Sequence, residues 1–192
     1  MRQLLTSQSF LRRFLRDQQA IAVVEFALVL PVLMILFYGV VEVTRFILIT
    51  QKVEKLAHSV ADMTAQEHVA TTAALDQVLA AASDIMNPYA MTNNGKIVIS
   101  SLYRTAGVAQ ASVNWRYEGG GTLAGVTSHL GAVGATPTMP TGFTFDEREN
   151  VIAAEVFYRF SPLISNQFFG TVTVYRAAFY KPRFGELIVP PV

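Results

Sequence analysis

The chain has 192 residues, 52% of them hydrophobic, and its 15 basic and 14 acidic side chains leave a formal net charge of +1. This balance gives no global basic field, so nucleic-acid binding is not expected. The sequence contains no cysteine, which excludes disulfide bonds, thiolate chemistry and cysteine-ligated metal sites. Its length accommodates one membrane helix and one domain of ordinary size.

The first 20 residues form a basic flank that we expect to lie in the cytoplasm. Four arginines outnumber the one acidic residue there, Asp17; they are Arg2, Arg12, Arg13 and Arg16. Basic residues next to a membrane helix favour the cytoplasmic side. The rest of the chain beyond that helix is therefore predicted to be periplasmic or otherwise extracytoplasmic.

An apolar run from Ala20 to Val41 predicts a membrane-spanning helix, to which we assign residues 21–45. A helix of about 22 residues rises about 33 Å, enough to cross a hydrocarbon core of about 30 Å. The one charged side chain between Ala20 and Val41 is Glu25. A cleaved secretory signal peptide fits poorly, because the run is long and no small-x-small site closes it promptly.

Three residues inside this helix have consequences beyond hydrophobicity. Glu25 is a candidate functional residue, because an acidic side chain inside a membrane helix is costly and usually functional. Pro31 removes one backbone hydrogen bond, which predicts a kink. Gly39 lets another helix approach closely.

Past the membrane the helix is expected to continue into a domain of residues 46–192. Apolar residues recur at spacings of three and four, which is a heptad pattern. This heptad stripe consists of Phe46, Ile49, Val53, Leu56, Val60 and Met63. It must bury against the domain's own sheet or against a partner helix, while Lys52 and Lys55 lie off it. Glu42 and Arg45, three residues apart, can pair just outside the membrane.

The remaining sequence predicts a second helix followed by strands. The helix spans Thr71 to Met86, and Asn87-Pro88 ends it. The predicted strands cover residues 96–103, 112–117, 151–160 and 171–180. Trp115 is expected to be buried, with a partner for its indole N–H. These elements predict an α+β fold in which an antiparallel sheet of about four strands packs on the long helix.

Two parts of the domain carry further expectations. Residues 118–149 are rich in glycine and proline and predict a long loop. In residues 151–160 apolar side chains alternate with Glu155 and Arg159, which predicts one buried and one solvent-facing side. Asp146, Glu147 and Glu149 lack the spacing of a calcium loop, so we expect them to be solvated at the surface.

No pattern of residues predicts catalysis. The histidines are His58, His68 and His129, and the first two are ten residues apart, too far for shared metal ligation on one helix turn. The sequence has no H-E-x-x-H, G-x-S-x-G or P-loop motif. We therefore expect no enzymatic activity, no cofactor, no metal and no small-molecule substrate.

The chain resembles the TadE-like family of minor pilins, or pseudopilins, of the Tad (Flp) pilus system. The segment AIAVVEFALVLPVLM, followed by YGVVEVTRF, is similar to the start of these proteins, and NVIAAEVFYRFSPL and TVTVYRAAFYKPRFGEL are similar to their end. The resemblance covers most of the chain outside residues 85–149. It implies a pilin-like domain and a non-enzymatic role in assembly of a Tad-type pilus.

The resemblance also implies roles for single residues. Type IV pilin-like proteins carry a glutamate five residues into the mature chain, after a prepilin peptidase has removed the leader. Glu25 takes that position if the cut falls between Ala20 and Ile21, although glycine is usual where Ala20 stands. Phe26 stands where Flp pilins often carry tyrosine. Glu25 would pair with the new amine and set subunit register; the alternative is a glutamate that extends to the lipid headgroups.

The implied surroundings are those of pilus assembly. They comprise the bacterial inner membrane, other pilin or pseudopilin subunits, the assembly platform and the prepilin peptidase. The alternative is an uncleaved, membrane-anchored adaptor of the same machinery, whose sequence would look nearly identical.

Overall fold

The computed structural model describes residues 18–163 and 170–192, with side chains described from residue 21 onward. The chain divides into two compact units, Met1–Arg45 and Phe46–Val192. The charged residues of the flank, from Arg2 to Asp17, lie outside the described residues.

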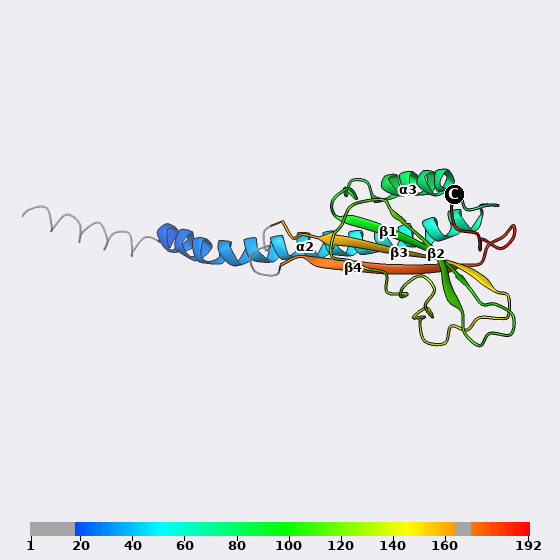
Figure 1. Cartoon of the computed structure of the whole chain (residues 1–192). Coiled ribbons are helices and arrows are strands. Elements are labelled where there is room, and N and C mark those ends of the chain that lie inside the picture. Colours follow the sequence, from blue (N-terminus) through cyan, green and yellow to red (C-terminus); the bar gives the residue numbers. More distant parts are fainter. Residues whose placement is uncertain (1–17, 164–169) are drawn as a thin grey trace, which may run out of the picture. The chain divides into compact units, whose positions relative to one another are not determined.

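Helix α2 runs from Gln18 to Ala65 and continues through Pro31. A second helix, α3, spans Thr72–Met86 (Figure 1). The side chain of Thr71 caps α3 by accepting a hydrogen bond from the Ala74 N–H at 3.1 Å, which satisfies one of the free donors of its first turn. Asn87 is the C-cap residue. The predicted second helix is therefore confirmed, with its first residue one position later.

Four strands form one antiparallel sheet in the order β2-β1-β3-β4. They are β1 (Gly95–Tyr103), β2 (Ser112–Gly119), β3 (Asn150–Phe160) and β4 (Val172–Tyr180). The register between β1 and β2 shifts between Ser101 and Leu102. All four predicted strands are confirmed to within two residues at each end, and the fold is α+β.

One face of the sheet packs against the two helices. Its core joins residues of α2, α3 and alternate positions of β1 and β3, including Leu56, Leu75, Ile99, Ile152 and Val156. Leu56, Ile99 and Val156 are fully buried. The apolar side chains that point to this face follow the alternation of a half-buried strand.

The other face of the sheet is buried at β3 as well, which corrects the prediction of a solvent-facing side for residues 151–160. Loop residues between β2 and β3 cover it: Leu130 packs with Val151 and Ala153, and Leu123 packs with Phe157. The eleven residues of β3 are buried except Arg159, which is partly buried. The stretch of residues 120–149 between these strands is long enough to cross the sheet, and strand alternation alone does not reveal such a cover.

The last residues of the chain are tied into the domain by a buried polar network. Leu187 O accepts hydrogen bonds from Trp115 Nε1 and Ser101 Oγ, both at 2.7 Å, and Leu187 N–H donates to Asn150 Oδ1 at 2.8 Å. Asn150 Nδ2 in turn donates to Ser101 Oγ at 2.8 Å. The buried indole therefore has the partner that the sequence predicted, and the network pairs polar groups whose burial would otherwise be costly.

Candidate functional site

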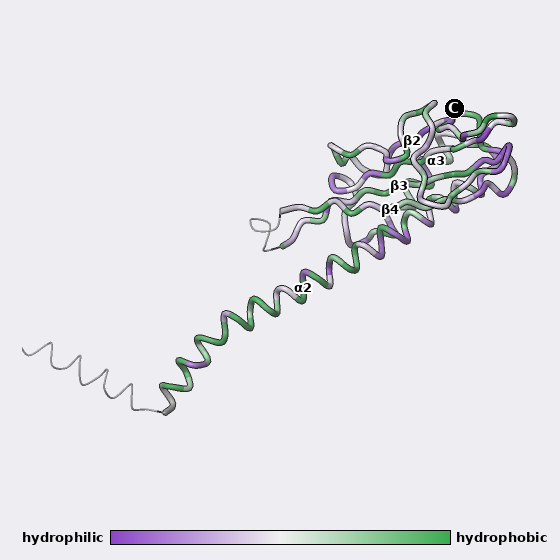
Figure 2. Tube along the Cα trace, turned by 90° about the horizontal axis from the view of Figure 1, so that it is seen from below, coloured by the Kyte–Doolittle hydropathy of each residue, from purple (hydrophilic) through white to green (hydrophobic). Residues whose placement is uncertain are grey.

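The apolar part of α2 is exposed on every side. All residues from Ile21 to Val40 are exposed, and Leu28 and Ile35 reach 72% and 71%. Soluble proteins rarely expose a continuous apolar surface of this size. Within the described residues, α2 is the one helix that is long and apolar enough to cross a membrane. The green tube along the first half of α2 shows this segment (Figure 2), which we identify as a membrane anchor.

Glu25 and Phe26 lie one turn into this apolar segment. Both are exposed on the helix, Phe26 at 61%. Ile21 lies four residues before Glu25, so the two residues share one face of the helix. Ala20 belongs to the helix, but its side chain lies outside the described residues. Pro31 lies inside the helix, and the kink there remains a prediction.

Polar residues follow directly after the apolar segment. Arg45 Nη1 donates to Glu42 Oε2 at 3.2 Å, and both side chains are mostly buried. One residue earlier, the Thr44 hydroxyl donates to Val40 O at 2.8 Å, which satisfies that hydroxyl within the helix. The anchor is thus followed by paired rather than isolated polar groups.

The heptad stripe lies in the core of the second unit. Four of its members are buried: Ile49, Val53, Leu56 and Val60, at 2% exposure or less. Met63 is partly buried against the same core. Phe46 is 37% exposed and packs edge-on against Phe160, with ring centroids 5.4 Å apart. The stripe therefore packs on the domain's own sheet and on α3.

The position of Lys52 off the stripe indicated a solvated side chain. The structure instead shows this side chain half-buried and hydrogen-bonded. Its Nζ donates to Ile85 O at 2.9 Å and to Asn87 O at 2.8 Å, at the end of α3. A cation at this position satisfies the free carbonyls of the last turn and favours the negative end of the helix dipole. Because Ile85 lies 33 residues further along the chain, the helical periodicity of α2 could not reveal this contact.

Glu155 is the polar residue whose role the sequence did not indicate. It is fully buried in the middle of β3. Its carboxylate accepts hydrogen bonds from the Ser128 hydroxyl, from the His129 N–H at 2.8 Å and from the Tyr175 hydroxyl at 3.0 Å. Ser128 also accepts from Arg116 Nη2 at 2.9 Å. This cluster joins the loop to β2, β3 and β4, so Glu155 anchors the cover of the sheet.

The surroundings of the Tyr175 phenol raise its pKa. Burial raises its pKa, and the negative charge of Glu155 and the hydrogen bond to it raise the pKa further. Each of these effects disfavours the phenolate. The hydroxyl therefore stays protonated and donates to Glu155 over the whole physiological range.

One of the three acidic residues before β3, Glu149, is paired rather than only solvated. Glu149, whose side chain is 8% exposed, lies 2.6 Å from Lys181 Nζ and accepts a hydrogen bond from the Asp146 N–H at 2.5 Å. Burial raises the pKa of Glu149, but its hydrogen bonds to Lys181 and Asp146 outweigh this and leave it below the usual value. The expected surface solvation is therefore wrong for Glu149.

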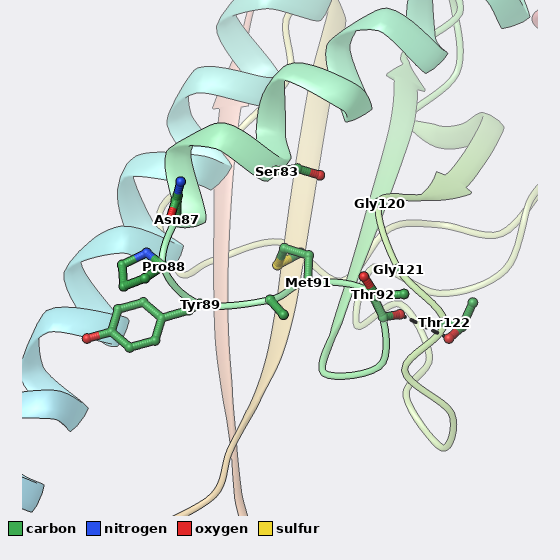
Figure 3. Close-up of a pocket in the computed structure, with 10 residues that line it drawn as sticks. Ser83, Asn87, Pro88, Tyr89, Met91, Thr92, Gly120, Gly121 and Thr122 are labelled. Carbon is green, nitrogen blue, oxygen red and sulfur yellow. Dashed lines mark hydrogen bonds between the residues drawn. The ribbon is translucent and has the colours of Figure 1, made fainter.

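A shallow hollow of about 480 Å³ lies between the end of α3 and the turn after β2. Figure 3 shows its lining, with Pro88 and Tyr89 on one side and Gly121 and Thr122 on the other; the Thr122 hydroxyl donates to Thr92 O at 3.0 Å. No charged side chain lines it. The hollow has no converging groups for acid–base or nucleophilic chemistry.

The histidines lie at three separate places against aromatic rings. His58 lies edge-on to Tyr180, His68 stacks on Phe184 and His129 packs against Tyr175. Among the described residues no three His, Asp or Glu side chains form a group that could hold a metal ion.

Comparison with known proteins identifies a family for the exposed helix. Residues 20–62 match the family model described as TadE-like protein. This segment contains Glu25, Pro31, the Glu42–Arg45 pair and all but the last residue of the heptad stripe. No curated protein and no solved structure matched the chain. The match supports, over residues 20–62, the resemblance seen in the sequence.

Proposed function

We propose that this TadE-like chain is a membrane-anchored minor pilin, or pseudopilin, that takes part in assembly of a Tad-type pilus without catalysing a reaction. One observation carries the proposal: a glutamate lies in a fully exposed apolar helix, within the segment that matches the family. An apolar helix that only anchors a domain has no need of a carboxylate. Glu25 therefore serves contacts with other helices in the membrane.

The physics of Glu25 favours a partner amine. A carboxylate at the bilayer centre costs about 2.5–3.5 kcal/mol, and less near the helix end. Cleavage between Ala20 and Ile21 by a prepilin peptidase creates an α-ammonium about 6 Å along the helix from Glu25. In low dielectric this amine, on the same or a neighbouring subunit, is a favourable partner. Such a pair fixes axial register between packed helices, as buried polar residues do in coiled coils.

The proposed orientation follows from the arginines of the basic flank. They place the N-terminus in the cytoplasm and the domain from Phe46 onward outside it, across a bacterial inner membrane. In that arrangement the domain can meet other pilin subunits and the assembly platform.

The second candidate is an uncleaved adaptor of the same machinery. Ala20 favours it, because glycine is usual before the cut in type IV pilin-like proteins. In that case Ile21 has no free amine, and Glu25 would extend to the headgroups instead.

N-terminal sequencing of the protein extracted from membranes separates the two candidates. A mature chain that begins at Ile21 supports the pilin, and an intact basic flank overturns it in favour of the adaptor. Three variants then test the mechanism: Glu25→Ala, Glu25→Gln and Ala20→Gly. Each is compared with the unmodified chain by immunoblotting of the processed fraction and by electron microscopy of surface pili.

The expected pattern is specific to an ion pair. Both Glu25 variants should still insert, since removal of the charge favours insertion, yet they should lose most pili. Ala20→Gly should be cleaved equally well or better. Wild-type piliation in Glu25→Gln, which keeps shape and polarity, would show that the charge pair has no part in assembly.

A further inference from the structure

Strands β2 and β4 are the two edges of the sheet, and they differ in how their outer side is covered. The loop pairs with the edge of β2: Val113 N–H donates to Ala135 O at 2.9 Å, and Val113 O accepts from Gly134 N–H at 2.8 Å. Among the described residues, residues 173–179 of β4 have backbone-to-backbone hydrogen bonds only with β3, in a register without a bulge. Strand β4 therefore presents a regular edge onto which another strand can pair.

The backbone groups that face outward on β4 follow from the pairing of β3. Arg159 N–H of β3 donates to Asn94 O, next to β1, at 2.6 Å. In an antiparallel pair the N–H and C=O of one residue point to the same side, and successive residues alternate. Odd-numbered residues of β3 therefore face β1, and even-numbered ones face even-numbered residues of β4. The residues of β4 with outward backbone groups are Thr173, Tyr175, Ala177 and Phe179.

One side-chain contact agrees with this direction. The Arg176 side chain is 43% exposed, and its Nη1 donates to Tyr175 O at 2.8 Å in an exposed contact. The carbonyl of Tyr175 thus accepts from the neighbouring side chain at the position where the N–H of a further strand would lie.

A groove accompanies this edge on the side of the loop. A hollow of about 470 Å³ is lined by β4 and by the loop but by no residue of β3, so it lies at the outer side of β4. Leu130, Met139 and Pro140 give its loop wall an apolar character. A second hollow, of about 300 Å³, adjoins Thr173 and Tyr175 of the same strand. A strand added to the edge would direct every second side chain toward this groove.

The charge beside the groove selects the partner. Arg176 is the one Lys, Arg, Asp or Glu residue that lines either hollow, and its Nε lies 3.8 Å from Glu54 Oε2. An added strand would supply its own N–H to Tyr175 O and so release the guanidinium from that carbonyl. Opposite charges on facing positions of paired strands attract. An acidic side chain on the added strand would therefore be favoured opposite Arg176.

A second copy of this chain is a poor occupant of the edge. A two-fold pairing that uses the whole of β4 is centred on Arg176 and places two arginines directly opposite each other, which is unfavourable. Pairing with β2 of a second copy meets the loop, which already occupies that edge at Val113. The fitting occupant is a segment of a different protein.

We propose that residues 173–179 of β4 bind an extended segment of another protein, which joins the sheet as a fifth, antiparallel strand. The segment carries apolar side chains toward the groove and an acidic side chain opposite Arg176. Every residue of this surface belongs to the domain from Phe46 onward, so the proposal does not depend on the role of Glu25.

Synthetic peptides test this surface. The probe is a fluorescein-labelled peptide of sequence Ser-Val-Glu-Leu-Glu-Val-Ser, in which apolar and polar side chains alternate. One control peptide has the amide of its leucine N-methylated, and the other has lysine in place of both glutamates. Each is titrated by fluorescence anisotropy with the full chain in detergent, either unmodified or as Ala177→Pro, Arg176→Gln or the control Lys55→Gln. Lys55 is an exposed lysine that lines neither hollow.

The unmodified chain should bind the probe saturably and slow hydrogen exchange in residues 173–179. The N-methylated peptide should bind about tenfold more weakly, because it cannot donate to the edge. Ala177→Pro should weaken binding similarly, since proline removes one outward N–H and is tolerated on an edge strand. Arg176→Gln should lose the preference for glutamate over lysine, and Lys55→Gln should retain it.

Three results would overturn the proposal. They are the absence of saturable binding, equal binding of the N-methylated peptide, and protection of residues 173–179 that depends on protein concentration without peptide, which would assign the edge to a second copy. A preference for glutamate that survives in Arg176→Gln would contradict the acidic partner. Trp115 fluorescence verifies that each variant is folded.

Discussion

Helices cover one face of the sheet, and an irregular loop covers the other. On one face, α2 and α3 satisfy their own backbone hydrogen bonds and contribute a contiguous apolar core. On the other face, an irregular loop lies over two smaller apolar clusters and is held by buried polar groups around Glu155. A helical cover is specified by a repeated pattern, whereas a loop cover depends on a few individual contacts.

This difference predicts that damage to the helix-covered face affects the whole domain. Val53 is fully buried on that face, so Val53→Asp places an unpaired carboxylate in the core. Such burial costs several kcal/mol out of a total stability of about 5–15 kcal/mol. We expect loss of the folded domain, measured by the fluorescence of Trp115 in detergent.

The control for this variant is Lys55→Asp, two positions away and exposed. It should leave the Trp115 signal unchanged, since exposed substitutions usually stay within about 0.5 kcal/mol. Equal damage from both variants would refute the assigned register of α2.

Damage to the loop-covered face should be more local. Glu155→Ala leaves the donors of Ser128, His129 and Tyr175 without their acceptor. We expect a loss of about 2–3 kcal/mol of unfolding free energy. Hydrogen exchange should rise in loop residues 123–135 and change little in α3.

Glu147→Ala, which removes an exposed carboxylate of the same loop, is the matched control. Glu155→Gln adds a second readout, because it removes the charge that helps to raise the pKa of Tyr175. The Tyr175 pKa should fall toward its usual value. If exchange rises equally throughout the domain, the loop is not a separate cover.

A smaller effect is expected where α3 meets α2. Lys52→Met keeps the apolar stem but removes the two hydrogen bonds to Ile85 O and Asn87 O. The loss should be about 1 kcal/mol, as for other interactions at a helix C-terminus. Chemical denaturation measures the unfolding free energy of Lys52→Met and of the control Lys55→Met. The control should lose almost nothing, because Lys55 is exposed. Equal losses in the two variants would show that Lys52 acts only through its charge.

The smallest effect is the pH dependence of the Glu149–Lys181 pair. The pKa of Glu149 is lowered in the folded state, so its stabilisation is present above its ordinary pKa of 4.5 and is lost as pH falls below it. The pKa of Lys181 is raised, chiefly by its hydrogen bond to Glu149, so that contribution is full below 10.5 and lost at higher pH. Acidification should lower the melting temperature of Glu149→Gln less than that of the wild type. Identical melting profiles of the two proteins would contradict this pairing.

Most of the helix-covered face could be predicted from the sequence, because heptad spacing, strand alternation and the Thr71 cap are local patterns. The positions of Glu155 and Lys52 could not. Their partners, at Ser128 and Ile85, lie 27 and 33 residues away along the chain, and no local period encodes such contacts. Strand order was equally hidden, since β1 pairs with both β2 and β3 across the long loop.

For the candidate site, the sequence located the apolar helix and its single carboxylate, because both are properties of one continuous segment. It could not show which side chains near the domain's entrance stay exposed. The contact of Phe46 with Phe160 joins residues separated by almost the whole domain. The surroundings of Phe46 are therefore a product of tertiary structure.

The packing of α2 in the domain core has a mechanical consequence. A force applied along the domain's part of α2 acts along the row of packed side chains of Ile49, Val53, Leu56 and Val60. Those side chains interlock with a close-packed core that transmits strain. The load is then a shear that opposes many contacts at once rather than a peeling that opens them one by one. A domain pulled along this part of α2 would resist unfolding in the direction of the pull.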